Sequence, residues 1–305
     1  MRVVGIGQCS WDYLAVVDSF PAVDTKAEVS NWQEQGGGPV ATALVTLARL
    51  GVPCDFHGVV GDDTESLKIR NSLLDEGIGA SHLITRENAV SQKAFIAIEQ
   101  GSAKRTIFWQ RPSGLPLLPG ELPESFLDDC SLLLLDGLMS EVSLFAANKA
   151  RELNIPVMLD AGRVRPGMVE IARLCDYLVA SEQFALDLGW SGIPQDFREQ
   201  VQGLGSTVVT ITVGAHGSIT YRDSEIIAIP AFQVDALDTT GAGDVFHGAY
   251  IFGLLHGLDL ADTIRFASAV AAIKCTRVGG RTGIPDKEAS LRFLAERGVG
   301  IRLNG

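Results

Sequence analysis

A seven-residue run, Asp238 to Asp244, leads without a break into a long apolar stretch, Val245 to His256. The apolar residues of that stretch fall on every face of the helix it predicts, and such a helix must lie inside a large core. Gly241 and Gly243 have no Cβ, so the chain can turn sharply just before the helix. The segment therefore predicts a glycine loop that opens a buried helix.

The same loop can bind an anion. The amides of Gly241, Ala242 and Gly243 can point toward one place, where the positive end of the helix dipole adds to their field. Asp244 follows in the first helical turn, where it can accept the proton of an attacking hydroxyl. Bound phosphate with a carboxylate beside it suits phosphate transfer to an alcohol. We expect Asp244 to be the general base and the three amides to form the anion hole, although an isolated run of this kind can also be a plain helix start capped by Thr240.

Composition agrees with a globular α/β protein. The 305 residues are 46% hydrophobic with 33 glycines, enough for a large core. A formal charge of −12 argues against nucleic acid or an anionic membrane as a partner, since either needs a basic surface. The five cysteines form no Cys-x-x-Cys pair, so neither a zinc cluster nor a disulfide framework is indicated. The N-terminal MRVVGIG has no secretory pattern and no apolar stretch reaches membrane-span length, so we expect a cytoplasmic protein.

Along most of the chain, predicted strands alternate with predicted helices, which favours a mainly parallel sheet covered on both faces. Arg2 to Ile6 is typical of a first strand, and Pro39 to Leu50 of a helix with proline at its start and Gly51 after its end. Short apolar runs typical of central strands follow at Leu132 to Leu135, Pro156 to Leu159, Tyr177 to Val179 and Val208 to Val213.

Two pairs of segments depart from this alternation. Tyr13 to Asp18 with Glu28 to Gln33, and Lys93 to Glu99 with Arg105 to Gln110, carry aromatic and β-branched residues at near-alternate positions. They predict antiparallel strands that pair into a second, small sheet. Because no repeat or low-complexity linker separates them, we expect one domain over 1–305, with the small sheet inserted at about 11–35 and 90–111.

The motifs carry a family resemblance. The string DTTGAGDVFHGA, together with GGGPVATA (Gly36 to Ala43), GVVGDD (Gly58 to Asp63) and CTRVGGRTGIP (Cys275 to Pro285), resembles the ribokinase-like (PfkB) carbohydrate kinases. The last segments are most similar to the branch that contains sulfofructose kinase. The resemblance implies transfer of phosphate from ATP, with Mg²⁺, to a sugar, with a ketose type as the first expectation. It also implies a small sheet that acts as a lid over the sugar and forms a homodimer interface.

The resemblance suggests which residues hold the sugar. Asp12 follows the first strand, where open α/β sheets bind ligands, and is similar to the family's aspartate that holds sugar hydroxyls. Gly36, Gly37 and Gly38 precede the helix that starts at Pro39 and present a helix N-terminus. The asparagine that the family often has a few residues later is absent from Val40 to Thr42. Six basic residues lie in or near the predicted lid and strand ends, and Lys26 and Arg163 are the best candidates to pair with an anionic substrate group; the others are Lys93, Arg105, Arg111 and Arg165.

For nucleotide and metal, the resemblance points to four further segments. Asp160 and Arg163 are similar to a family element near the phosphates. Ser181 and Glu182 stand where the family has Asn-x-x-Glu, and Glu182 is expected to hold Mg²⁺ through water. Nucleotide phosphate and ribose are expected at Thr212, Gly214 and Gly217, whereas His216 and His247 are expected to pack or lie on the surface. A monovalent cation such as K⁺ is expected, on the resemblance, at the oxygens of Asp238, Thr240, Cys275 and Gly280.

Three other functions remain open. An NAD-dependent dehydrogenase is suggested by Gly5 and Gly7, but Ser10 replaces the third glycine and a predicted strand replaces the required helix. A nucleoside kinase of the same fold and a non-catalytic sugar sensor both fit the motifs, since fold alone does not settle function. No Gly-x-x-x-x-Gly-Lys-Ser/Thr run occurs, so phosphate binding must rely on the glycine loops near positions 214 and 241.

Overall fold

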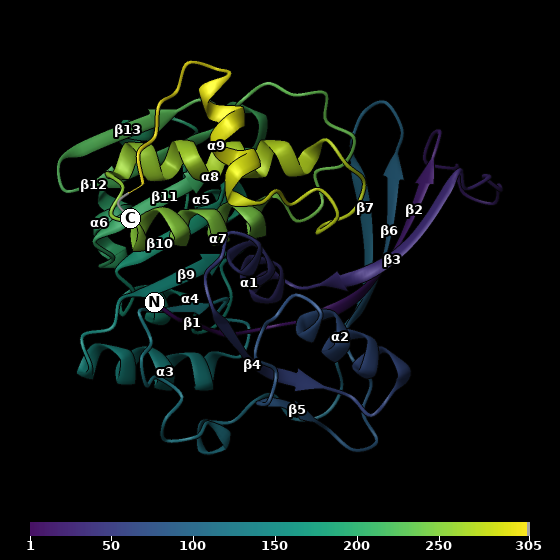
Figure 1. Ribbon diagram of the computed structural model, residues 1–305, viewed down its shortest axis with the longest axis horizontal. Helices are drawn as coiled ribbons and strands as arrows, with labels where there is room; N and C mark the ends of the chain where they lie inside the picture. Colours follow the sequence, from purple (N-terminus) through teal and green to yellow (C-terminus); the bar gives the residue numbers. More distant parts are fainter. Residues whose placement is uncertain (304–305) are drawn as a thin grey trace.

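The computed structural model describes residues 1–303, which form a nine-stranded sheet, a four-stranded sheet and surrounding helices (Figure 1). The strand order of the large sheet is β13-β12-β11-β10-β9-β8-β1-β4-β5. Its neighbouring strands are parallel as far as β11, after which β12 and β13 are added antiparallel. The bounds are β1 Val3–Ile6, β4 Cys54–Val60, β5 Leu83–Thr85, β8 Leu132–Leu135, β9 Val157–Ala161, β10 Tyr177–Ser181, β11 Val208–Thr212, β12 Ser218–Arg222 and β13 Glu225–Ile229.

Helices cover both faces of this sheet and belong to two separate apolar cores. The first core includes residues of α1 (Pro39–Arg49), α2 (Thr64–Leu74), α7 (Ala242–Leu255), α8 (Leu260–Cys275) and α9 (Lys287–Ala295). The second includes residues of α3 (Ser140–Glu152), α4 (Met168–Ala172), α5 (Glu182–Asp187) and α6 (Arg198–Leu204). Short 3₁₀ turns lie at Pro119–Glu121, Pro194–Phe197 and Gly214–His216.

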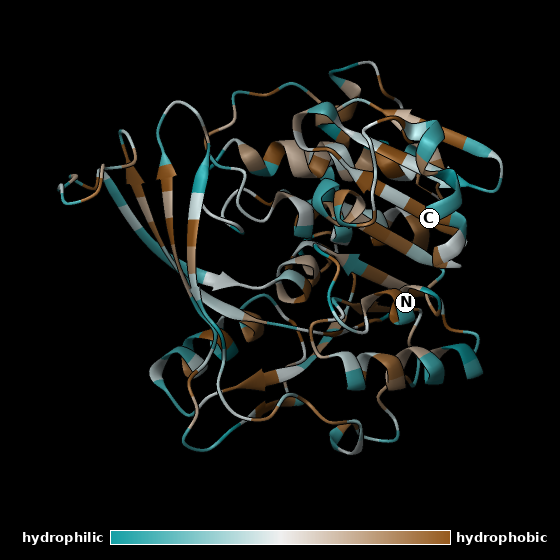
Figure 2. Cartoon of the chain, turned by 180° about the vertical axis from the view of Figure 1, so that it is seen from behind, coloured by the Kyte–Doolittle hydropathy of each residue, from teal (hydrophilic) through white to brown (hydrophobic). Residues whose placement is uncertain are grey.

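Alternation along the strands explains why there are two cores. In β8, Leu132 and Leu134 enter the first core while Leu133 and Leu135 enter the second. Successive side chains of a strand point to opposite faces, so a strand covered on both faces must be apolar throughout. The central strands are accordingly mostly brown in Figure 2. The predicted doubly covered, mainly parallel sheet is confirmed.

The second sheet contains β2 (Ser10–Val17), β3 (Asn31–Gly37), β6 (Lys93–Glu99) and β7 (Arg105–Gln110) in the order β3-β2-β6-β7. It stands at one side of the main body in Figure 1. The predicted strands pair antiparallel within each segment, but β2 and β6 join the two segments in parallel. The prediction that β3 starts at Glu28 is wrong, because the strand begins at Asn31 and continues to Gly37, in register with Ser10. We call this sheet the lid.

The predicted buried helix is α7, in which the residues from Val245 to Gly253 are all buried. Gly248 lies so close to the backbone of Ala43 in α1 that a Cβ would collide with it. This close approach packs α7 against α1 and places the N-termini of both helices on the side of the sheet where its parallel strands end. None of the helices within residues 1–303 combines the length and hydrophobicity that crossing a lipid bilayer requires.

Candidate active site

A cavity lies between the lid and the carboxyl ends of the parallel strands. Open α/β sheets bind their ligands at this edge. The walls come from four places: the lid, the N-terminus of α1, the ends of β9 to β11, and the first turns of α7. The lining residues include Asp12, Gly38, Ile96, Arg105, Ile107, Trp109, Asp160, Ser181, Thr212, Thr240, Gly241, Gly243, Asp244 and His247. We call it the acceptor cavity.

A second groove, of about 600 Å³, adjoins the acceptor cavity. Its lining consists largely of small residues, among them Gly214, Gly217 and Ala272, together with the aromatic rings of Phe232 and Phe246. Thr212 and Gly243 line both spaces, so the two meet at the start of α7. The structure thus brings the predicted nucleotide residues Thr212, Gly214 and Gly217 to the same place as the Asp238 to Asp244 run.

The glycine loop has free amides where an anion hole needs them. Gly241 is the N-cap of α7, with φ at 72°, a conformation that favours glycine. Within residues 1–303 no group accepts from the amides of Gly241, Gly243 and Asp244, whereas the Ala242 amide donates to Thr239 O at 3.2 Å. Two of the three predicted amides are therefore available, and the amide of Asp244 is a third donor that the sequence did not single out.

Asp244 lies half-buried at the floor of the acceptor cavity, in the first turn of α7. Burial raises the pKa of its carboxyl to about 7, and the charge of Asp160 raises it further, while His247 and Arg105 oppose the shift. A base with a pKa near neutrality is well matched to proton transfer. A helix N-terminus by itself lowers the pKa of a carboxyl group, but desolvation dominates over the dipole here.

His247 connects the first turn of α7 to strand β10 of the sheet. Nδ1 lies 2.6 Å from Gly243 O, and Nε2 lies 3.0 Å from Val179 O. Both carbonyl oxygens can only accept, so the ring satisfies both when each nitrogen carries a proton. Nε2 is also 3.5 Å from Asp160 Oδ1. The prediction that His247 packs inside the protein agrees with its burial, and the structure also places it among the charges of the site.

Asp12 and the glycine loop before α1 form the wall opposite α7. Ser10 Oγ donates to Asp12 Oδ1 at 2.7 Å, and burial raises the pKa of the Asp12 carboxyl. Gly38 has φ at 94°, and a Cβ there would touch Cys9 Cα at 2.6 Å, so only glycine fits. Gly37 packs against Asp12, and a Cβ at position 37 would collide with Asp12 Oδ2. The local backbone therefore places Asp12 against the cavity.

The lid is joined to the glycine loop at the mouth of the cavity. Arg105 Nη1 donates to Thr239 Oγ1 at 2.7 Å, which joins β7 to the glycine loop. Ile107 and Trp109 follow on the same strand at alternate positions, so all three side chains share the face that lines the cavity. The lid thus supplies an apolar wall and one cation.

Several predicted residues lie outside the cavity. Lys26 is exposed in the loop between β2 and β3, and Glu182 is exposed at the start of α5. Arg163 is 60% exposed at its side chain and lies 3.5 Å from Asp187 Oδ2 in α5. Ser181, in contrast, lines the cavity, and its Oγ caps α5 by accepting a hydrogen bond from Phe184 N at 3.2 Å. Gly36 lies behind the wall, against Arg281.

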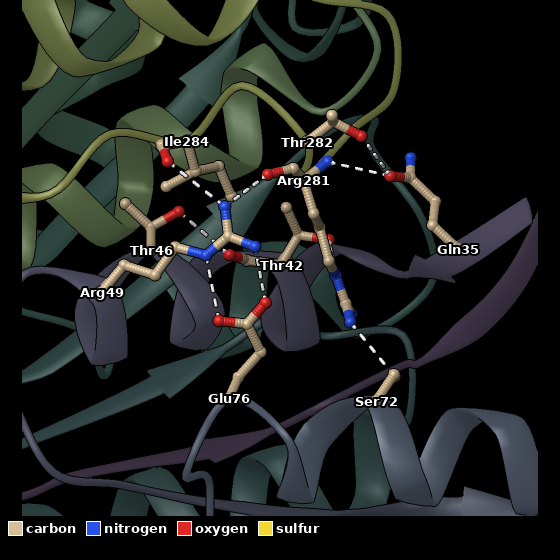
Figure 3. Close-up of polar contacts among 9 residues, drawn as sticks. All are labelled: Gln35, Thr42, Thr46, Arg49, Ser72, Glu76, Arg281, Thr282 and Ile284. Carbon is tan, nitrogen blue, oxygen red and sulfur yellow. Dashed lines mark hydrogen bonds and ion pairs between the residues drawn. The ribbon is translucent and has the colours of Figure 1, made fainter. Parts of the chain in front are cut away.

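Arg281 supports the wall from behind (Figure 3). Its guanidinium is buried and donates to Gly37 O at 3.1 Å and to Thr42 Oγ1 at 3.3 Å. Arg49 Nη1 donates to Arg281 O at 2.7 Å and is itself held by Glu76. The loop after α8 is therefore tied to both α1 and the end of β3. The sequence marks this loop only as part of a motif and carries no signal for the buried arginine.

The oxygens expected to hold a monovalent cation also meet near this loop, and two of the four main-chain oxygens already have partners. Asp238 O accepts from Lys274 Nζ at 2.9 Å, and Cys275 O accepts from Leu237 N at 2.8 Å. Both carboxylate oxygens of Asp238 are bonded, Oδ1 to Thr240 and Oδ2 to the Gly279 amide.

Sequence reasoning missed His247 and the apolar lid wall as parts of the site, and it did not single out Arg105 among its basic candidates. A signal existed for His247, because residues three and four apart share a helix face and this histidine is so placed relative to Asp244 and Gly243. Arg105 was one of six basic candidates of equal type, and its contact with Thr239 joins segments 134 residues apart. Such a pairing follows from the fold and not from local sequence.

Comparison with known proteins agrees with this site. A model of the pfkB family of carbohydrate kinases matches residues 1–287. Ribokinase of Haemophilus influenzae is 29% identical over 299 residues, which cover 95% of this chain and 97% of the relative. Nucleoside kinase of Methanothermobacter thermautotrophicus is 27% identical over 302 residues, covering 97% and 96%.

Comparison with solved structures agrees with these sequence matches. A crystal structure of ribokinase from Thermotoga maritima has a TM-score of 0.79 and 27% identity, and the match covers 96% of this chain and 99% of that one. The finer likeness to the sulfofructose kinase branch stays a prediction. The dehydrogenase alternative is excluded, because Ser10 to Val17 forms a strand where a dinucleotide-binding fold needs a helix directly after its glycines. The chain belongs to the pfkB family of carbohydrate kinases.

Proposed function

We propose that this kinase transfers the γ-phosphoryl group of ATP to a hydroxyl of a sugar or sugar derivative. The supporting observation is that the second groove, which we call the nucleotide groove, meets the acceptor cavity at Gly243, beside the free amides and next to Asp244. A phosphoryl group held there faces an acceptor on one side and the nucleotide on the other. Catalysis of this kind depends mainly on positioning and charge stabilisation.

Each residue then has a defined task. Asp244 accepts the proton of the attacking hydroxyl, which is worth on the order of 10²- to 10⁴-fold in rate for a positioned base. The amides of Gly241, Gly243 and Asp244 stabilise the charge that develops on the phosphoryl oxygens. Asp12 accepts hydrogen bonds from other hydroxyls of the acceptor, and Arg105 and Trp109 hold the lid over it and exclude water.

The groove suits ATP because it offers an apolar slot for the base and leads to unpaired amides. Ribokinase of Arabidopsis thaliana has been solved in complex with ribose and ATP. For Mg²⁺, Glu182 is exposed and unpaired within residues 1–303, as a carboxylate that acts through water must be. When bound, Mg²⁺ supplies positive charge to the β- and γ-phosphates. Lys26 and Arg163 keep a proposed role only for an acceptor with an anionic group of its own.

The first acceptors to test are ketoses and their derivatives, on the motif resemblance. A second candidate is a nucleoside, and one observation favours it: the lid side of the cavity is an apolar wall of Ile96, Ile107 and Trp109. An aromatic ring can stack on such a wall, which a bare sugar does not require. The nucleoside kinase relative has the same overall span as this chain.

We also propose that the chain is a single kinase domain that forms a homodimer through the lid. On the outer face of the lid an aromatic row runs from Trp32 through Phe95 and Phe108 to Phe20, with ring centroids 5.7, 6.2 and 6.4 Å apart. These side chains are 38 to 55% exposed. An exposed apolar patch of this kind is typical of an interface.

The test is an ATP-consumption assay over ketoses, aldoses, sugar phosphates and nucleosides, with Mg²⁺ present and the phosphorylated product identified by mass. We expect turnover of at least one sugar, lost in Asp244→Asn. Turnover of nucleosides alone selects the second candidate. A thermal-shift screen of the same compounds with ADP covers the sensor alternative, since a ligand raises the melting temperature whether or not it reacts. Binding of a sugar without turnover by the wild type would overturn the kinase proposal.

A further inference from the structure

Lys274 is a buried cation that the proposed reaction does not use directly. It lies in the last turn of α8, its side chain is 0% exposed, and Nζ donates to Asp238 O at 2.9 Å. A lysine is almost never fully buried unless its charge has partners. Those partners must be sought among the groups around Asp238.

Charges face the ammonium from three elements. Asp238, in the loop before α7, is fully buried and carries the main negative charge, and Asp244 in α7 adds to it. Arg105 of the lid opposes them, and burial lowers the pKa of Lys274. The ammonium therefore balances a buried carboxylate directly beside the glycine loop.

This is the place where the family resemblance predicts a monovalent cation. The residues present do not fit that ion. Asp238 O is bonded to Lys274, Cys275 O accepts two amides, from Leu237 at 2.8 Å and Asp238 at 3.2 Å, and the Asp238 carboxylate accepts from Thr240 and Gly279. A second cation about 4 Å from the ammonium would be repelled strongly enough to weaken its binding by roughly a thousandfold.

The surrounding loop is also held in place without an ion. Gln35 of the lid accepts from the Arg281 amide at 3.3 Å, and Arg49 donates to the carbonyl oxygens of Arg281 and Ile284 at 2.7 and 3.2 Å (Figure 3). Together with the bond from Gly279 N to Asp238, these contacts tie residues 279 to 284 to three different segments. An ion is not needed to bring the segments together.

We propose that the Lys274 ammonium takes the place of the monovalent cation, so that this kinase is active without K⁺. By holding Asp238 O, Lys274 acts as a positioning residue for the backbone that leads to Gly241 and its free amides. The inference rests on the proposed phosphotransfer for its kinetic readout. Its binding readout is independent of that proposal.

The experiment compares wild type, Lys274→Met and Lys274→Gln in potassium and choline buffers of equal ionic strength. Methionine keeps the apolar stem and removes the charge, and Lys287→Met, at an exposed lysine of α9, is the matched control. We measure phosphotransfer with the best acceptor and, separately, the melting temperature without nucleotide or acceptor. The wild type and the control should differ by less than about twofold between the two buffers. Lys274→Met should lose at least tenfold in choline and regain most of that loss in potassium.

In the thermal experiment, potassium should raise the melting temperature of both Lys274 variants and leave the wild type unchanged. If no acceptor is turned over, the proposed function fails while this readout still decides the inference. A wild type that potassium activates or stabilises would overturn it. The proposal would also be overturned by Lys274 variants that fold but show no gain in activity or melting temperature with potassium, and by variants that fold in neither salt. In both cases potassium would have failed to fill the site that the ammonium left.

Discussion

Asp244 illustrates a conflict between stability and function in one residue. Burial raises its pKa to about 7, so the folded protein prefers the neutral acid, while the reaction needs the carboxylate. A carboxyl whose folded pKa is raised stabilises the fold at acid pH and loses that contribution as the pH rises through the folded pKa. Removal of the charge should therefore help the fold increasingly as the pH rises from about 4 to about 7.

We predict that Asp244→Asn loses at least a hundredfold in turnover, while its affinity for ATP changes little. The same variant should melt at a higher temperature than the wild type at pH 8, and the difference should be smaller at pH 5. Calorimetry at both pH values, beside nucleotide titration, makes the comparison. Wild-type turnover in this variant would remove Asp244 from the role of base.

The pH dependence gives a second prediction at this scale. Activity should rise with pH through about 7, because Asp244 must be ionised to accept a proton. His247 lowers the pKa of Asp244, so His247→Gln should move this acidic limb to higher pH. The measurement is kcat/KM against pH, with the exposed His216→Gln as the control. A lower rate with an unmoved limb would mean that His247 serves packing alone.

At the scale of helices and strands, the lid shows which features the local sequence pattern predicts and which it does not. The alternating residues of β6 and β7 predict both strands with the bounds that the structure has, since a half-buried strand has a period of two. The parallel pairing of β2 with β6 is not local, because it joins segments about 80 residues apart in the sequence. The contact of Arg105 with Thr239 depends on that pairing.

We predict that Arg105→Ala weakens this closure. The variant loses a charged hydrogen bond of about 1.5 to 3 kcal/mol, so the KM for the acceptor should rise roughly tenfold or more. The KM for ATP should stay nearly constant, because the nucleotide groove does not include Arg105. Lys104→Ala, at the exposed neighbouring position, serves as the control. An equal change in both KM values would contradict a role specific to the lid.

At the scale of the whole molecule, the aromatic row predicts self-association. A charge in the middle of an apolar interface is costly to desolvate, so Phe108→Asp should convert the dimer to monomer. Sedimentation velocity over a range of concentrations measures this, and Leu153→Asp, an exposed leucine at the end of α3, should leave the dimer intact. A wild type that sediments as a monomer throughout would refute the lid dimer.

The amino-acid sequence was sufficient to predict the layered fold and the glycine loop, and it singled out Asp244 and Asp12, which the structure places at the cavity. These features depend on local physics: strand and helix periodicities, the conformational freedom of glycine, and the unpaired amides at a helix start. Each of them can be recognised within about a dozen residues.

The charge arrangement around those features could not be predicted in the same way. His247 contacts Asp160, Arg105 contacts Thr239 and Lys274 contacts Asp238 only because the sheet order brings distant segments together. Electrostatic energies depend on distance and burial, neither of which is encoded in the spacing of residues along the chain. The folded chain therefore decides how Asp244 titrates and which cation stands beside the glycine loop.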